Sequence, residues 1–79
     1  MRNPKQLFAV STISRADIAK ILTDHDAVEE DSDRLTNEFC RGFANALYNL
    51  EADYGNMDDI PEDTFFGFVL AQAKKLPPV

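Results

Sequence analysis

The sequence predicts a small all-α protein, a single domain over residues 1–79 folded as a bundle of three to four short helices. Apolar residues recur along it at three- and four-residue steps, the spacing that lines one face of a helix. Capping residues and prolines stand where such helices would begin and end. A chain of this length buries only about 60% of its unfolded surface, so its stability is expected to be low. We therefore expect a homodimer, since a second subunit is one way to stabilise so small a scaffold.

The clearest predicted helix covers residues 33–54. Its apolar positions fill about 140° of a helical wheel, which is typical of a face that packs on a core. These positions are Leu35, Phe39, Phe43, Ala46, Leu47, Leu50 and Tyr54. Ser32 or Asp31 is expected to cap its start. Gly55 is expected to end it in a left-handed turn.

A shorter helix is predicted over residues 15–24. The Ser14 hydroxyl is placed to accept from a first-turn amide while Asp17 reaches back, which is the arrangement of a capping box. The residues expected to face the core are Ile18, Ile21 and Leu22, with His25 beyond them.

Two interpretations remain open for residues 4–10. Asn3 and Pro4 suit the cap and the first position of a short helix. The apolar run that follows fits an extended arm equally well. We favour the helix, which would be the fourth of the bundle.

The last predicted helix covers residues 61–76, with Pro61 at its first position. Two acids follow Pro61 and two lysines stand near the end, an order that suits the helix dipole. Its apolar residues spread over about 200°, which is wider than one core requires. Either the helix is central and covered by all the others, or its surplus residues form an oligomer interface. The surplus residues are Phe66, Phe68 and Leu70.

The charge is distributed very unevenly. The net charge is −6, and every acidic residue except Asp17 lies between Asp24 and Asp63. Such a surface opposes direct binding to nucleic acid or to an anionic membrane, because both attract clustered lysine and arginine. No apolar run is long enough for a membrane span or a secretory signal. With a single unpaired cysteine, these features indicate a cytoplasmic protein.

No catalytic, metal or nucleotide motif is present, so we expect no enzyme activity, no cofactor and no metal. A calcium loop opening at Asp24 would put Glu29 where its glycine belongs and Leu35 where its bidentate glutamate belongs. His25 has acidic neighbours but no adjacent nucleophile, and it suits a helix C-terminus. Cys40 is expected to be buried and inert. Residues 12–22 resemble the first helix of a helix-turn-helix, but the tight turn is missing.

The two acidic clusters are the most informative feature that remains. They are either a solubilising surface or a docking surface for a basic partner. The expected first contacts are Asp24, Asp26, Glu29, Glu30, Asp31 and Asp33, and the second set is Asp58, Asp59, Glu62 and Asp63.

We favour a small acidic module that binds a basic protein or nucleoprotein complex, in particular one that handles nucleic acid. In size and charge the chain resembles phage or mobile-element inhibitors of host defence complexes, including anti-CRISPR and DNA-mimic proteins. That resemblance implies the same kind of partner. The alternative is an oligomeric assembly or structural protein whose main interface is the aromatic helix over residues 61–76.

Overall fold

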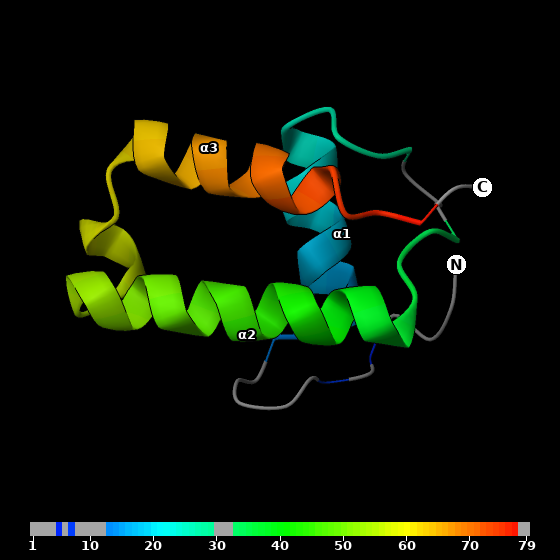
Figure 1. Ribbon diagram of the computed structural model, residues 1–79, viewed down its shortest axis with the longest axis horizontal. Helices are drawn as coiled ribbons and strands as arrows, with labels where there is room; N and C mark the ends of the chain where they lie inside the picture. The colour runs from blue at the N-terminus through cyan, green and yellow to red at the C-terminus, as the bar shows by residue number, and fades with distance from the viewer. Residues whose placement is uncertain (1–4, 6, 8–12, 30–32, 78–79) are drawn as a thin grey trace.

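The computed structural model describes residues 5, 7, 13–29 and 33–77, and in these ranges it contains three α-helices and no sheet. They are α1 (Arg15–Asp24), α2 (Asn37–Tyr54) and α3 (Glu62–Ala73), with a short 3-10 helix, η1 (Met57–Asp59), between the last two. In Figure 1, α2 and α3 run in opposite directions and α1 crosses behind them. The predicted small all-α fold is confirmed.

The limits of α1 agree with the prediction, and so does its cap. The Ser14 Oγ accepts from the Asp17 backbone N–H at 3.2 Å, while the Asp17 carboxylate accepts from the Ser14 N–H at 3.0 Å. This reciprocal pair satisfies two amides that the first turn would otherwise leave unpaired.

A Schellman motif ends α1. The Ala27 N–H donates to the Leu22 carbonyl at 2.8 Å, and the Asp26 N–H donates to the Thr23 carbonyl at 2.9 Å. Asp26 takes the left-handed position with φ of 56°, which glycine usually occupies.

The structure corrects the start of α2. We predicted helix from residue 33, but α2 begins at Asn37 and Thr36 caps it, accepting from the Phe39 N–H at 3.2 Å. The caps that we predicted, Ser32 or Asp31, lie outside the described residues. The end is as predicted, since Gly55 follows Tyr54 with φ of 89°.

A buried arginine explains why the helix begins late. Arg15, 1% exposed, donates from Nε to the Leu35 carbonyl at 2.9 Å and from its guanidinium to the Asn37 side chain. This arginine binds the Leu35 carbonyl and the Asn37 side chain, and the backbone at Thr36 is extended just before α2 begins.

The third helix is shorter than predicted at both ends. Pro61 caps α3 with an extended backbone instead of occupying the first helical position. After Ala73 the chain tightens, with Leu76 N–H donating to the Ala73 carbonyl at 3.1 Å. Pro77 limits how far the helix could extend, because Leu76, the residue before this proline, is disfavoured in the helical region.

Of the predicted N-terminal helix, most residues lie outside the described part of the chain. Leu7 is described, and it forms an isolated antiparallel bridge with Ser14. The backbone pairing at Leu7 is the kind expected of the extended-arm alternative.

The core lies where the three helices meet. Its side chains include Ile18 and Leu22 from α1, Phe43 from α2 and Val69 from α3, each fully buried. The Phe43 ring meets Phe68 edge-on at 5.4 Å between centroids, which joins α2 to α3.

The buried face of α2 differs in part from the predicted arc. Ala44, which we had left out of that arc, is 1% exposed, while Cys40 is fully buried as predicted. Tyr54, which we had included, is 39% exposed. Tyr54 reaches solvent because it is the last residue of α2, beyond the core.

Candidate protein-binding surface

One surface hollow, which we call the His25 hollow, lies between the end of α1, η1 and the first turns of α3. Its volume is about 530 Å³. It is lined by His25, Met57, Asp58, Ile60, Glu62, Asp63, Phe65 and Phe66. The fold therefore places part of the second acidic cluster beside aromatic rings.

His25 is held in place at this hollow. Its Nδ1 lies 2.8 Å from the Ile21 carbonyl oxygen one turn back. Its ring is tilted against Phe66 and Phe65, at 5.3 and 5.9 Å between centroids. None of the residues that line the hollow is a serine or a cysteine.

The four acids of the second cluster differ in their contacts. Asp59 faces Asn56, which donates from Nδ2 to the Asp59 carboxylate at 2.9 Å and accepts from the Asp59 N–H at 3.2 Å. Asp58, Glu62 and Asp63 line the hollow and are exposed. Three of the four predicted acids of the second cluster are thus brought together.

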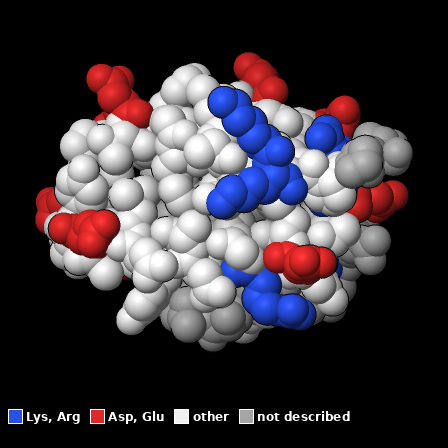
Figure 2. All heavy atoms as spheres, in the orientation of Figure 1, with Lys and Arg blue, Asp and Glu red and all other residues white. Residues whose placement is uncertain are grey.

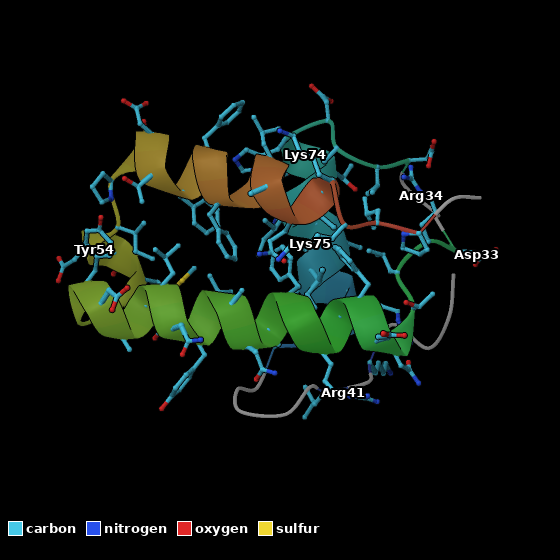
Figure 3. The ribbon with its side chains drawn as sticks, in the orientation of Figure 1. Asp33, Arg34, Arg41, Tyr54, Lys74 and Lys75 are labelled. Carbon is cyan, nitrogen blue, oxygen red and sulfur yellow. The ribbon has the colours of Figure 1, made fainter. Side chains whose placement is uncertain are left out.

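The first predicted cluster is spread out. Asp24 and Asp26 are exposed on either side of His25 in the sequence, and Glu29 is exposed in the loop that follows. Glu30 and Asp31 lie outside the described residues. Asp33 is exposed at the opposite end of the molecule from Tyr54 and η1 (Figure 3). None of the described acids of this cluster is among the residues that line the His25 hollow.

The face seen in Figure 2 has lysine and arginine side chains in its middle, and its carboxylates are scattered, most of them towards the margin. Figure 3, in the same orientation, identifies the central cations as Lys74 and Lys75.

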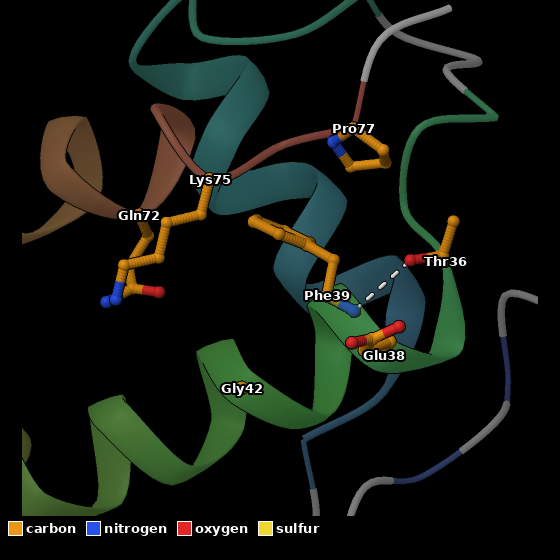
Figure 4. Close-up of a pocket in the computed structure, with 7 residues that line it drawn as sticks. All are labelled: Thr36, Glu38, Phe39, Gly42, Gln72, Lys75 and Pro77. Atoms are coloured by element: carbon orange, nitrogen blue, oxygen red, sulfur yellow. Dashed lines mark hydrogen bonds between the residues drawn. The ribbon is translucent and has the colours of Figure 1, made fainter.

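A second hollow of about 370 Å³ lies between α2 and the end of α3 (Figure 4). Its charged residues, Glu38 and Lys75, have opposite sign, and the Thr36 hydroxyl is already bound in the cap of α2. Because these two charges are opposite, this hollow favours neither a cationic nor an anionic ligand.

The three predicted interface residues of α3 separate into two groups. Phe68 is partly buried, against Phe43 and, at 6.1 Å between centroids, Phe65. Phe66 and Leu70 are 49% and 39% exposed. Phe68 is therefore covered by the chain itself, while the other two stay available on the surface.

Sequence reasoning did not single out Met57, Ile60 and Phe65 as site residues, and it predicted no element between Gly55 and Pro61. A signal was present: Asn56 precedes Asp59 by three residues, the spacing of a capped turn. That turn is η1, and it positions Ile60, which is 8% exposed.

Other kinds of site have little support in the described part of the chain. No three His, Cys, Asp or Glu side chains gather there in a metal-binding arrangement. Cys40 is fully buried, and its burial raises the pKa of the thiol even though Arg15 acts to lower it. None of the helices described is both long and apolar enough to cross a membrane.

Comparisons with protein-family models, curated proteins and solved structures found no match to this chain.

Proposed function

We propose that this protein is a small, cytoplasmic, non-enzymatic module that docks a basic, nucleic-acid-handling partner through its carboxylate-rich surface. The observation that most supports this is the His25 hollow, where Asp58, Glu62 and Asp63 stand around aromatic rings. Lysine and arginine have an apolar stem and a cationic head. The stem would pack on the Phe66 ring while the head meets the carboxylates.

The energetics call for several contacts together. A single exposed ion pair contributes about 0–1 kcal/mol, and an exposed cation–π contact about 0.5–1 kcal/mol. A useful affinity therefore needs a partner segment with more than one cation. The exposed Asp24, Asp26 and Glu29, on either side of His25 and after it in the sequence, would extend the contact.

A protein built to bind DNA is the partner that this charge suits best. Duplex DNA presents one negative charge per about 1.7 Å, so a DNA-binding groove is lined with cations. A phage or mobile-element inhibitor of a host defence complex, of anti-CRISPR or DNA-mimic type, would occupy such a groove.

The test is binding of a fluorescent peptide that carries several arginines and lysines, followed by anisotropy at low and high salt. The triple variant D58N/E62Q/D63N should bind at least about tenfold more weakly, since three ion pairs at about 0.5–1 kcal/mol each amount to that factor or more. The matched control neutralises three acids of α2, E38Q/E51Q/D53N, and should bind with little change.

The outcomes separate the mechanisms. Equal weakening by both triple variants would show that only the overall charge matters and that the hollow is not the site. Binding that is indifferent to salt and to both triples would reject the electrostatic mechanism, because exposed charges are screened by salt.

A second candidate function is assembly through α3, with the protein as a structural subunit. The exposed Phe66 and Leu70 favour it, since exposed apolar patches mark interaction sites. In sedimentation velocity, F66A and L70A should shift an oligomer towards monomer. The triple variant of α2 should not.

A further inference from the structure

The exposed face of α3 has an acidic end, an apolar middle and a basic end. Glu62 and Asp63 are exposed in its first turn, and Lys74 and Lys75 are exposed just after its last residue. The exposed positions between them are Phe66, Gly67, Leu70 and Ala71. We call these eight residues the α3 stripe.

The α3 stripe is continuous. Its positions follow two neighbouring rows of four-residue steps, 62–66–70–74 and 63–67–71–75, so the stripe winds along the helix surface, and at its basic end Lys75 also borders the second hollow beside Gln72. From residue 62 to residue 74 it extends for about 18 Å at the rise of an α-helix. Its middle is open, since no atom beyond the two chain neighbours and the nearby helix backbone lies within 4 Å of the position that a Gly67 Cβ would take. A second helix can therefore approach closely there.

We infer that this stripe is a homodimer interface on which α3 of a second copy lies antiparallel. The order of charges decides the direction. In an antiparallel pair, Glu62 and Asp63 of each copy lie opposite Lys74 and Lys75 of the other, so both ends attract. A parallel pair would set acid against acid and lysine against lysine.

The apolar middle matches itself in the same arrangement. A two-fold axis near residue 68 sets Phe66 of one copy beside Leu70 and Ala71 of the other. Both larger side chains then leave water, and Gly67 gives room for them. One face serves both copies, as a two-fold interface requires.

The pair is expected to be weak and salt-sensitive. A stripe of this length covers less than the roughly 800 Å² per partner of a standard stable interface. Its terminal ion pairs are exposed and therefore screened by salt. Glu62, Asp63 and Phe66 also line the His25 hollow, so pairing and docking of a basic segment compete.

This inference rests on the second candidate function and does not require the first. It is tested by sedimentation equilibrium over a range of protein concentrations, with reductant present so that a Cys40 disulfide is excluded. The variants are E62K/D63K, which makes both ends of the stripe basic, and K74E/K75E, which makes both ends acidic. Each alone should lose association by at least about tenfold, and an equimolar mixture should restore it.

The quadruple variant E62K/D63K/K74E/K75E fixes the direction. If the pair is antiparallel, this variant associates with itself and not with the original chain. If the pair is parallel, it associates with the original chain and not with itself, which would overturn the inference. The swaps oppose the helix dipole, so circular dichroism must first show that helix content is kept. The neutral E62Q/D63N and K74Q/K75Q changes replace any swap that unfolds, and each should weaken pairing.

The remaining outcomes are also decisive. A monomer at every concentration overturns the inference and the assembly function together. A dimer that L70A abolishes but the charge swaps do not alter leaves assembly through α3 standing and overturns the antiparallel pairing. Peptide binding by K74E/K75E, which keeps the hollow intact, reports on the basic-partner proposal separately.

Discussion

The Nε of Arg15 lies 2.9 Å from the carbonyl oxygen of Leu35, and both residues are 1% exposed. A cation at the first position of α1 thus binds the extended segment that leads into α2. The same Leu35 carbonyl lies 3.7 Å from the Cys40 Sγ. The packing of α1 against α2 depends on this buried polar contact as well as on apolar side chains.

Replacing Arg15 by methionine should therefore lower the free energy of unfolding by about 2–4 kcal/mol, because the buried Leu35 carbonyl loses its donor and the exposed Asn37 side chain loses a hydrogen-bond partner. Chemical denaturation followed by circular dichroism measures the change. The control is K20M, which removes an exposed cation from the same helix and should change stability by less than about 0.5 kcal/mol. Equal effects would show that the buried contact contributes nothing.

Replacing Asp26 by glycine should stabilise the protein by about 0.5–1 kcal/mol, since only glycine takes a positive φ without steric cost. The matched control is D24G, which removes the same charge but places glycine at the last position of α1. It should destabilise by about 0.5–1 kcal/mol. Thermal melting of both variants checks the opposite signs. A loss of stability in D26G would contradict the Schellman interpretation.

Two leucine-to-alanine changes should separate the core from the α3 stripe. Leu22 is fully buried, so L22A should cost about 2–5 kcal/mol and leave much of the chain unfolded. Leu70 is 39% exposed, so L70A should cost the monomer far less. Denaturation at low protein concentration makes the comparison. Equal losses would mean that Leu70 belongs to the core.

The Cys40 thiol should react slowly with a thiol reagent in the folded protein and quickly after unfolding, because it is buried and its pKa is raised. The raised pKa also determines how the stability of the protein changes with pH. The unfolded thiol releases its proton from its ordinary pKa of 9.0 upwards, while the folded thiol keeps its proton to higher pH. Stability should therefore fall as pH rises above that value. C40A should show a smaller fall, and an identical fall in both would contradict the assignment.

Local signals in the sequence predicted much of this structure. The apolar spacing predicted the three helices. The box formed by Ser14 and Asp17 predicted the start of α1, and Gly55 predicted the end of α2, because each of these signals acts within one or two turns. The predicted start of α2 was wrong because the true start depends on a residue far away in the sequence. It depends on Arg15, which is 20 residues from Leu35 in the chain.

The candidate site was predictable only in part. Asp58, Glu62 and Asp63 were expected to act together, and they do line one hollow. Their neighbour His25 comes from a helix some 30 residues earlier in the sequence, and no spacing rule connects the two. Phe68 showed the same limit, because a helical wheel cannot tell that Phe43 covers it.

By itself the sequence determined the fold class, the order of the helices and the sign of the surface, since these follow from local propensity and composition. The tertiary structure alone decided that Phe66 and Leu70 stay exposed while Phe68 is covered, and that Arg15 is buried. It also decided that Asp58, Glu62 and Asp63 lie beside aromatic rings. Those outcomes depend on how the helices cross, and the crossing depends on contacts between residues that lie far apart in the chain.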